Sequence, residues 1–174
     1  MTAIGTGYDL SVGTFSPEGR IFQVEYAGKA VDNSGTTLGL VTPGGVLLAV
    51  EKPLHSKLLK RHVNRRIETV DLHVGIVSCG FGPDVLALAK RAKEEAAGHR
   101  ETFVEDEGMP VRVLAERLGL YVHAHTLYSS VRPFGISSLL AGVDETGAKL
   151  FLIEPDGTHF VYSFSNYLFR DIKR

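Results

Sequence analysis

The sequence has little cysteine, little net charge and no long run of apolar residues. Its single cysteine, Cys79, excludes an internal disulfide, so a reducing intracellular compartment is the default expectation. The 19 basic and 20 acidic residues leave a formal charge of −1, which gives no electrostatic footprint for nucleic acid or an anionic membrane. The absence of about 18 consecutive apolar residues argues against a membrane-spanning helix. The N-terminus also lacks the basic start and apolar core of a secretory signal.

The composition is that of one globular domain. A chain of 174 residues has the length of a single domain, and 44% hydrophobic with 22% charged residues is ordinary for a soluble protein. The predicted order of elements is one helix, four strands, two helices and three strands, without an internal repeat. This order favours two sheets with a helical layer.

The stretch from residue 8 to residue 27 is predicted to be an irregular arm that leads into a helix. Ser16, Pro17 and Glu18 form a helix-start signal, because a side-chain oxygen can cap, proline is tolerated in the first turn and a carboxylate suits the positive end. The helix is expected to run from about Pro17 or Arg20 to about Val31. It carries two apolar stripes, one of Ile21, Val24, Ala27, Gly28 and Val31 and the other of Phe22, Tyr26 and Ala30. The second stripe can meet the chain's own core or a neighbouring subunit, and the pattern leaves both possibilities open.

Two apolar runs predict a β-hairpin. They cover residues 36–41 and 46–50 and flank the turn signal Thr42-Pro43-Gly44-Gly45. Both runs are too uniformly apolar for one face of their sheet to be exposed to solvent, so we expect a sheet that is covered on both sides. Residues 52–66 are strongly basic and are expected to form a solvated loop and strand edge. Further strands are expected at 66–71, 74–79, 137–143, 148–154 and 158–164.

Two more helices are predicted between these strands. Asp84 can cap a helix from about Val85 to Gly98, whose inward side chains would be Val85, Leu88, Ala89, Ala92 and Ala96. After a polar link from 99 to 108, another helix begins near Pro110 and is ended by Arg132-Pro133. Its apolar stripe would consist of Val111, Leu114, Leu118, Tyr121, Val122, His125 and Tyr128.

Few residues are candidates for chemistry. His123 and His125 would point about 200° apart on a helix, so they cannot share a metal, and the seven histidines show no ligand spacing. His125 lies on an apolar stripe and is expected to be a hydrogen-bonded core residue. The loop from Gly80 to Asp84 lacks the lysine and third glycine of a phosphate loop and does not predict a nucleotide site. Cys79 is expected to be a small buried apolar group. No cofactor or metal is expected.

Several blocks resemble the proteasome α-type family. Tyr8-Asp9 followed by the segment 15–27 is similar to the N-terminal signature of that family. Three further blocks agree with it, namely 33–39, 71–75, and 132–135 together with 142–144. Segments 4–11 and 122–129 make the chain most similar to the eukaryotic α7 type, and the resemblance covers about residues 1–162.

The resemblance implies a fold. It is an α+β fold, the αββα four-layer sandwich of N-terminal nucleophile hydrolases, incomplete at the C-terminus. The chain would then divide into a gate arm (1–16), an α-type domain (17–164) and a divergent tail (165–174). Family members continue past this point, so we expect a truncated or alternatively spliced product, or a mispredicted gene, with one sheet face left uncovered.

The resemblance also implies a role. It is that of a non-catalytic subunit of the seven-membered α ring of the 20S proteasome, in the cytoplasm and nucleus. Such a subunit takes part in ring assembly, axial gating and docking of regulatory particles in ubiquitin-dependent protein degradation. The expected partners are neighbouring α subunits, β-ring subunits and regulatory particles, with no nucleic acid and no membrane.

Individual residues acquire roles from the same resemblance. Tyr8, Asp9, Pro17 and Tyr26 match the family's gate cluster, and Phe22, Tyr26 and Ala30 are expected at a subunit interface. Arg66 falls where many α subunits have a lysine that pairs with the C-terminal carboxylate of regulatory particles. Arginine differs from lysine in geometry, so a structural role is favoured for Arg66.

The resemblance implies that the catalytic groups of β-type subunits are replaced here. Gly35 stands at the position of the nucleophilic threonine, Glu51 at that of the assisting acid and Arg66 at that of the essential lysine. Arginine cannot accept a proton near neutral pH, so Arg66 cannot take the lysine's role. The alternative is a β-type threonine peptidase produced by cleavage before Thr36, but this cut would remove the arm and place the threonine one position out of register.

Overall fold

The computed structural model describes residues 7–53, 56–60, 63–103, 108–162 and 167–169. Its elements are, in chain order, α1 (Phe22–Asp32), β1 (Thr37–Thr42), β2 (Gly45–Val50), β3 (Ile67–Asp71), β4 (Val74–Gly80), α2 (Gly82–Phe103), α3 (Val111–Ala124), β5 (Ile136–Asp144), β6 (Gly147–Ile153), β7 (His159–Tyr162) and β8 (Tyr167–Phe169). The predicted order of helices and strands is therefore confirmed. The additional strand, β8, lies in the segment that was expected to be a divergent tail.

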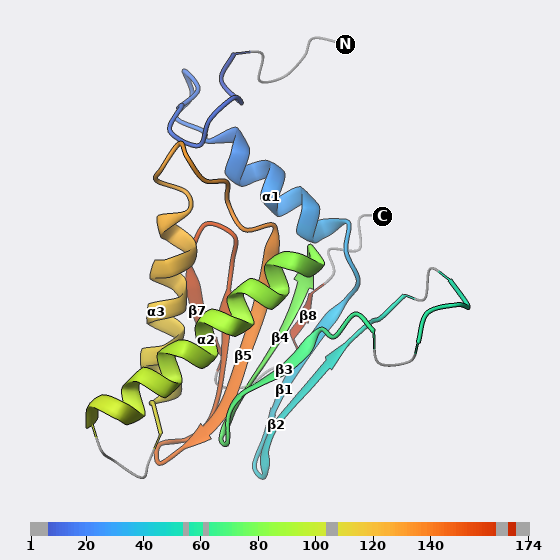
Figure 1. Cartoon of the computed structure of the whole chain (residues 1–174), viewed down its shortest axis with the longest axis vertical. Helices are drawn as coiled ribbons and strands as arrows, with labels where there is room; N and C mark the ends of the chain where they lie inside the picture. The colour runs from blue at the N-terminus through green and yellow to red at the C-terminus, as the bar shows by residue number, and fades with distance from the viewer. Residues whose placement is uncertain (1–6, 54–55, 61–62, 104–107, 163–166, 170–174) are drawn as a thin grey trace.

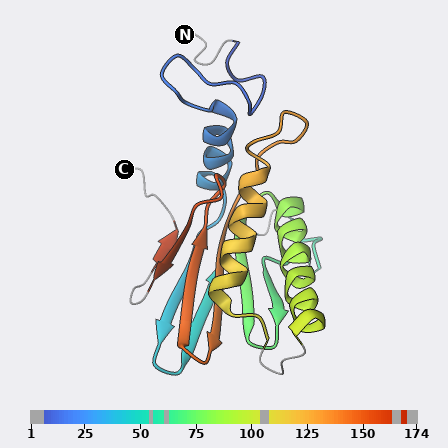
Figure 2. The same cartoon turned by 90° about the vertical axis from the view of Figure 1, so that its left-hand side faces the viewer.

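Two sheets and a helical layer make up the fold. The strand order is β2-β1-β8 in the smaller sheet and β3-β4-β5-β6-β7 in the larger one, and every pair is antiparallel. Helices α2 and α3 cover one face of the larger sheet, and the smaller sheet lies against its other face (Figures 1 and 2). Helix α1 lies across one end of the sandwich (Figure 1). This is the predicted α+β fold, and the described residues supply one helical layer and both sheets.

The β1–β2 hairpin forms as predicted. Its register runs from Thr37 opposite Val50 to Thr42 opposite Gly45. Gly39 lets β1 approach the larger sheet, because a Cβ at this position would lie 2.8 Å from a methyl group of Leu150. Tight contact between the two sheets therefore depends on the missing side chain.

The smaller sheet is not covered on both sides. One face packs on the larger sheet, where Val41, Val46 and Leu48 contact the core cluster formed around Leu139 and Leu150. The other face exposes Leu47, and no helix of the described chain lies over it (Figure 2). The expectation from the hairpin's apolar composition is thus wrong for this face, and the uncovered face implied by the family resemblance is found.

The main core lies between the helices and the larger sheet. Leu114 and Leu118 of α3 and Leu140 of β5 are fully buried there. All five side chains predicted to face inward from α2 are buried, namely Val85, Leu88, Ala89, Ala92 and Ala96. Burying one such side chain stabilises the fold by about 1.5–3 kcal/mol relative to leaving it in water. No helix of the described residues is long and apolar enough to cross a bilayer.

Both predicted helix caps are wrong. Helix α1 starts at Phe22, and the Ser16 hydroxyl instead accepts the Arg20 N–H at 3.0 Å inside a turn that precedes the helix. Helix α2 starts at Gly82, so Asp84 lies within its first turn, where its buried carboxylate binds Arg132 from another part of the chain. In both cases the side-chain oxygen accepts a hydrogen bond from an arginine, Arg20 or Arg132, and not from the unpaired N–H groups at a helix start.

The ends of α2 and α3 also differ from the prediction. Helix α2 extends to Phe103 and takes in the first half of the expected polar link, whose residues 104–107 lie outside the described part. Helix α3 ends at Ala124, and Tyr128, which was placed on its apolar stripe, is exposed. The last strand was predicted to reach residue 164, but β7 is described only to Tyr162, and residues 163 and 164 are among those the structure does not describe.

Candidate functional site

The arm that precedes α1 is held against the helix at Asp9. The Tyr26 hydroxyl donates a hydrogen bond to Asp9 Oδ2 at 3.3 Å, and the side-chain amide of Gln23 donates to the Asp9 carbonyl oxygen. Gln23 and Tyr26 are one helical turn apart and therefore lie on the same side of α1. Two of the four predicted gate residues, Asp9 and Tyr26, are thus brought together within one chain.

The other two predicted gate residues stand apart from this contact. Tyr8 is exposed beside Asp9. Pro17 is exposed in the turn that Ser16 closes, where the Ser16 N–H donates to the Arg20 carbonyl and the Gly19 N–H donates back to the Ser16 carbonyl. This closed turn sets the direction in which the chain enters α1.

Charges on the arm and on α1 perturb several ionisable groups. Burial, together with the negative charge and hydrogen bond of Asp9, raises the pKa of the Tyr26 hydroxyl above its ordinary value. The Tyr26 hydroxyl therefore keeps its proton at neutral pH and acts as a donor. Arg20 binds Glu25 at 2.5 Å, and this hydrogen bond lowers the pKa of the Glu25 carboxyl.

Gln23 is the residue of this site that the sequence analysis missed. Its amide is the second anchor of Asp9, and it binds a main-chain oxygen 14 positions away. In the sequence, its position one helical turn before Tyr26 could have pointed to Gln23 as part of this site. That spacing alone could not indicate which part of the arm would reach it.

The three residues predicted for a subunit interface are not equally available. Phe22 is only 6% exposed and stacks on Tyr26 with 6.3 Å between ring centroids, and the Arg20 guanidinium lies 5.3 Å from the centroid of the Phe22 ring. Tyr26 and Ala30 are half-buried and keep accessible surface. Most of the Phe22 side chain is thus used inside its own chain, and the interface prediction falls chiefly on Tyr26 and Ala30.

A hollow of about 400 Å³ contains the three positions that the family resemblance assigned to the catalytic groups of β-type subunits. Gly35, Glu51, Arg66 and Cys79 are among the residues that line it. The Thr36 N–H donates to a Glu51 carboxylate oxygen at 3.0 Å, and Arg66 Nη1 donates to the Gly80 carbonyl at 2.5 Å. A Cβ at Gly35 would lie 2.8 Å from the Glu51 carbonyl oxygen, so a threonine side chain does not fit there without a shift. The hollow offers a guanidinium and a carboxylate, and its arginine cannot act as a base.

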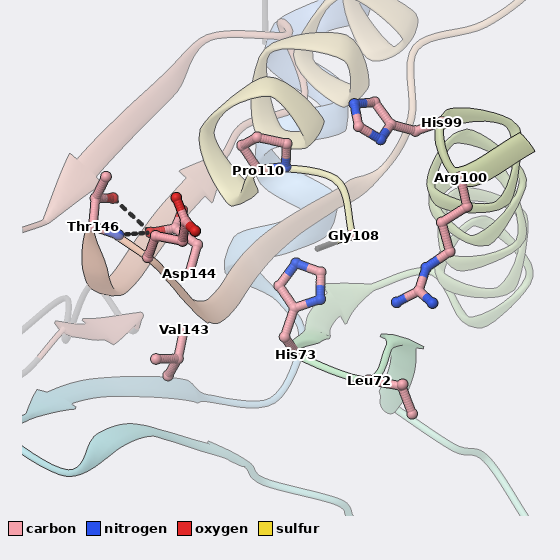
Figure 3. Close-up of a pocket in the computed structure, with 10 residues that line it drawn as sticks. Leu72, His73, His99, Arg100, Gly108, Pro110, Val143, Asp144 and Thr146 are labelled. Atoms are coloured by element: carbon pink, nitrogen blue, oxygen red, sulfur yellow. Dashed lines mark hydrogen bonds between the residues drawn. The ribbon is translucent and has the colours of Figure 1, made fainter. Parts of the chain in front are cut away.

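A second hollow, of about 440 Å³, is drawn in Figure 3. It lies beside the β3–β4 turn, at the end of the sandwich opposite to α1 (Figure 1). His73 in the β3–β4 turn and Arg100 near the end of α2 border it. The His73 imidazole hydrogen-bonds the Met109 carbonyl at 2.9 Å, and Arg100 binds the Asp71 carboxylate at 2.9 Å. These polar groups join the end of β3 and the β3–β4 turn to α2 and to Met109, two residues before α3, which indicates a structural junction.

His125 and Cys79 have the structural roles that were predicted, although His125 is only half-buried. His123 contacts the Asp156 carbonyl at 3.0 Å, whereas His125 contacts the Tyr121 carbonyl at 2.9 Å and packs edge-on against Phe134. Cys79 is buried. Among the described residues, no group of three or more His, Cys, Asp and Glu side chains could hold a metal ion.

Two family models match the chain. The model described as "Proteasome subunit" covers residues 31–165, and the model for the N-terminal signature of A-type proteasome subunits covers residues 8–30. The second range contains the arm, the Ser16 turn and most of α1.

Curated relatives agree with these matches. The chain is 51% identical over 162 residues to the probable alpha type-7 proteasome subunit of Saccharomyces cerevisiae, covering 93% of this chain and 56% of the relative. It is 53% identical over 160 residues to the alpha type-3 proteasome subunit of Acanthamoeba castellanii (92% and 63%), and 46% identical over 162 residues to that of Arabidopsis thaliana (93% and 64%). The chain therefore spans between 56% and 64% of the length of these relatives.

Proposed function

Since this chain belongs to the proteasome subunit family and carries the signature of its α-type members, we propose that it is a structural, non-catalytic subunit of the 20S α ring. The match over residues 8–30 is the observation that carries the proposal, because it coincides with the arm and the helix that hold Asp9. In this role the chain would contact neighbouring α subunits and β-ring subunits, in the cytoplasm and nucleus. It would contribute to axial gating and to docking of regulatory particles in ubiquitin-dependent degradation.

The geometry at Gly35 supports a non-catalytic role. The position of the nucleophile has no side chain, and its close approach to the Glu51 carbonyl leaves no room for one. The Arg66 guanidinium donates to the chain's own Gly80 carbonyl. A peptidase of this type needs a free threonine amine and a basic partner, and an arginine with a permanent charge cannot relay a proton.

The same contact at Arg66 favours a structural role over binding of activator tails. A guanidinium can bind a carboxylate through two parallel hydrogen bonds. Here one of its nitrogens is already used by the Gly80 carbonyl at the end of β4. A carboxylate arriving at this hollow would have to compete with that contact.

Co-assembly tests the proposed function directly. We expect the tagged chain, expressed with the other α-type subunits of a 20S proteasome, to co-purify with them in seven-membered rings visible by electron microscopy and native mass spectrometry. Untagged chain in excess should displace the tagged one. Recovery of the tagged chain alone, while the other subunits assemble without it, would contradict the proposal.

A substitution at Asp9 tests the role of the arm. In an assembled particle, we expect Asp9→Ala to change activator-stimulated peptide hydrolysis severalfold, because the Tyr26 hydroxyl loses its acceptor and the arm loses one of two anchors. Labelling of the catalytic threonines by a small covalent inhibitor should stay unchanged. Glu18→Ala is the matched control, since this exposed carboxylate pairs with Arg20 only at 3.9 Å. Unaltered stimulated hydrolysis in Asp9→Ala would count against a gating role.

A further inference from the structure

Strand β2 has an open side. It lies at the border of the smaller sheet, where it pairs with β1 on one side and with no strand of the described residues on the other (Figure 1). The Glu51 N–H donates to the Thr36 carbonyl of the neighbouring strand at 2.7 Å. Peptide groups alternate in direction along an antiparallel strand, so those of Val46, Leu48 and Val50 point to the open side. Such a row of N–H and C=O groups is a template for another strand.

The other strands at sheet borders have features that discourage pairing. The register of β3 shifts between Thr69 and Asp71, and its Glu68 carries a charge that pairs with Lys93 at 2.8 Å. Strands β7 and β8 are described over only four and three residues. Short strands, charges and irregular register are the usual means by which a sheet edge avoids a foreign strand. By contrast, β2 has six uncharged residues in continuous register with β1.

The side chains of β2 are also incompletely covered. Val46, Leu48 and Val50 pack against the core cluster between the two sheets but are only half-buried. Leu47 points to the uncovered face of the smaller sheet and is 54% exposed, next to the half-buried Leu40 on β1. Exposed apolar side chains gathered on one surface indicate a partner. A strand placed beside β2 would shield side chains on both faces of this sheet.

The sequence of β2 is complementary to itself in one antiparallel register. With a two-fold axis at Leu48, this residue lies opposite the Leu48 of a second copy, and Val46 lies opposite Val50. All three residues whose peptide groups point outward are then hydrogen-bonded to the second copy. On the uncovered face the large Leu47 falls opposite the small Ala49, and the six residues of β2 bring no like charges together.

We propose that the open side of β2 pairs with β2 of a second copy of this chain, antiparallel across a two-fold axis at Leu48. The two three-stranded sheets join into one continuous sheet. Both copies use the same surface, so the contact closes as a dimer and does not propagate into a ring or filament. This dimer goes beyond the proposed function, because it concerns the chain without sister subunits and a surface to which that function assigns no role.

Disulfide trapping tests the register. Leu47 and the second copy's Ala49 would form a pair without hydrogen bonds between them, whose Cα atoms lie about 4.5 Å apart, within reach of a disulfide. We expect covalent dimers when Leu47→Cys and Ala49→Cys, each in a Cys79→Ala background, are mixed and mildly oxidised, and none from either protein alone. Dimers from one variant alone would indicate another register and overturn the proposal. Absence of dimers from the mixture would overturn it too.

Sedimentation velocity of the full chain gives a second measurement. We expect a dimer in the unmodified chain, and we expect Leu47→Lys to weaken it at least severalfold, because a lysine on an edge strand opposes pairing. Val161→Lys is the matched control, since Val161 is 58% exposed on β7, at the border of the other sheet, and should leave the dimer unchanged. Equal weakening by the two substitutions would overturn the proposal. Entry of the unmodified chain into α rings, without dimers of the free chain, would also overturn it while leaving the proposed function intact.

Discussion

Replacing Arg132 by methionine is expected to lower the free energy of unfolding by about 3 kcal/mol at pH 7, since the buried Asp84 carboxylate would lose its counter-charge. Asp84 is 6% exposed, and both of its oxygens accept hydrogen bonds from Arg132 at 2.7 Å. The Gly135 N–H donates a third, at 3.0 Å. The side chain of Arg132 itself is largely exposed, and methionine retains much of its apolar stem. For a chain of this size the loss corresponds to a melting temperature roughly 6–12 °C lower.

The pH dependence of the stability of Arg132→Met separates the effect of the lost charge from the effect of changed packing. Burial alone would raise the pKa of Asp84, but the hydrogen bonds from Arg132 and the Gly135 N–H, with the charge of Arg132, lower it below its ordinary value. In the unmodified chain the stabilisation by the ionised Asp84 carboxylate is fully present above the unfolded-state pKa of about 3.9. It is lost as pH falls through the lower folded-state pKa. In the variant, burial dominates and the carboxyl protonates more easily. The difference between the two proteins should therefore shrink below about pH 4.

Thermal unfolding at pH 7 and at pH 3.5 measures both effects. Arg112→Met is the matched control, because Arg112 binds Glu116 at 2.9 Å on the exposed side of α3. An exposed pair one helical turn apart contributes about 0.3–0.5 kcal/mol. Equal destabilisation by the two substitutions would show that burial of Asp84 is not what matters.

Periodicity was enough to predict most of the fold. The inward side chains of α2 recur at helical spacing, and each of them is buried. The hairpin turn at 42–45 was predictable because glycine and proline are local signals that act within a few residues. These features depend on neighbouring residues, which a single sequence displays directly.

Side chains with two competing partners could not be assigned in the same way. Ser16 and Asp84 both fit the pattern of a helix cap, yet Ser16 closes a turn and Asp84 binds an arginine 48 positions away. The partner of Asp84 is determined by the burial of its carboxylate and by the position of Arg132 at the start of the segment that leads into β5. Neither is visible in the local sequence, since both depend on how distant segments pack.

The candidate site, too, was only partly predictable from the sequence. The resemblance to the α-type signature pointed to Asp9 and Tyr26, and the structure places them in contact across 17 positions. The two apolar stripes of α1 were recognisable, but periodicity could not tell which stripe would be buried. Phe22, from the stripe assigned to a neighbour, is buried with Ala27 and Val31. An aromatic ring at the first position of a helix can turn back over the preceding residues, which a helical wheel does not represent.

Gly80→Ala is expected to destabilise the chain by about 4 kcal/mol or to prevent it from folding. Gly80 has a φ of 104°, where a residue with a side chain is strained by ~1–3 kcal/mol. A Cβ would lie 2.1 Å from the Gly135 carbonyl oxygen and 2.8 Å from the Ile136 Cα, and overpacking of this kind costs a further ~1–3 kcal/mol. Both clashing atoms belong to the backbone, so no rotamer change can relieve them.

The consequences of Gly80→Ala would extend beyond the clash, because three contacts converge on this corner. The Phe81 N–H donates to the Gly135 carbonyl at 3.0 Å, Arg66 binds the Gly80 carbonyl, and the Gly135 N–H binds Asp84. Separating Gly80 from residue 135 would loosen all three, and with them the hollow lined by Gly35 and Arg66. Gly28→Ala is the matched control, since its Cβ would meet nothing within 4 Å and alanine should stabilise α1 by ~0.5–1 kcal/mol. Soluble yield and thermal unfolding measure both variants, and cooperative unfolding of Gly80→Ala at the unmodified chain's temperature would refute the role assigned to this corner.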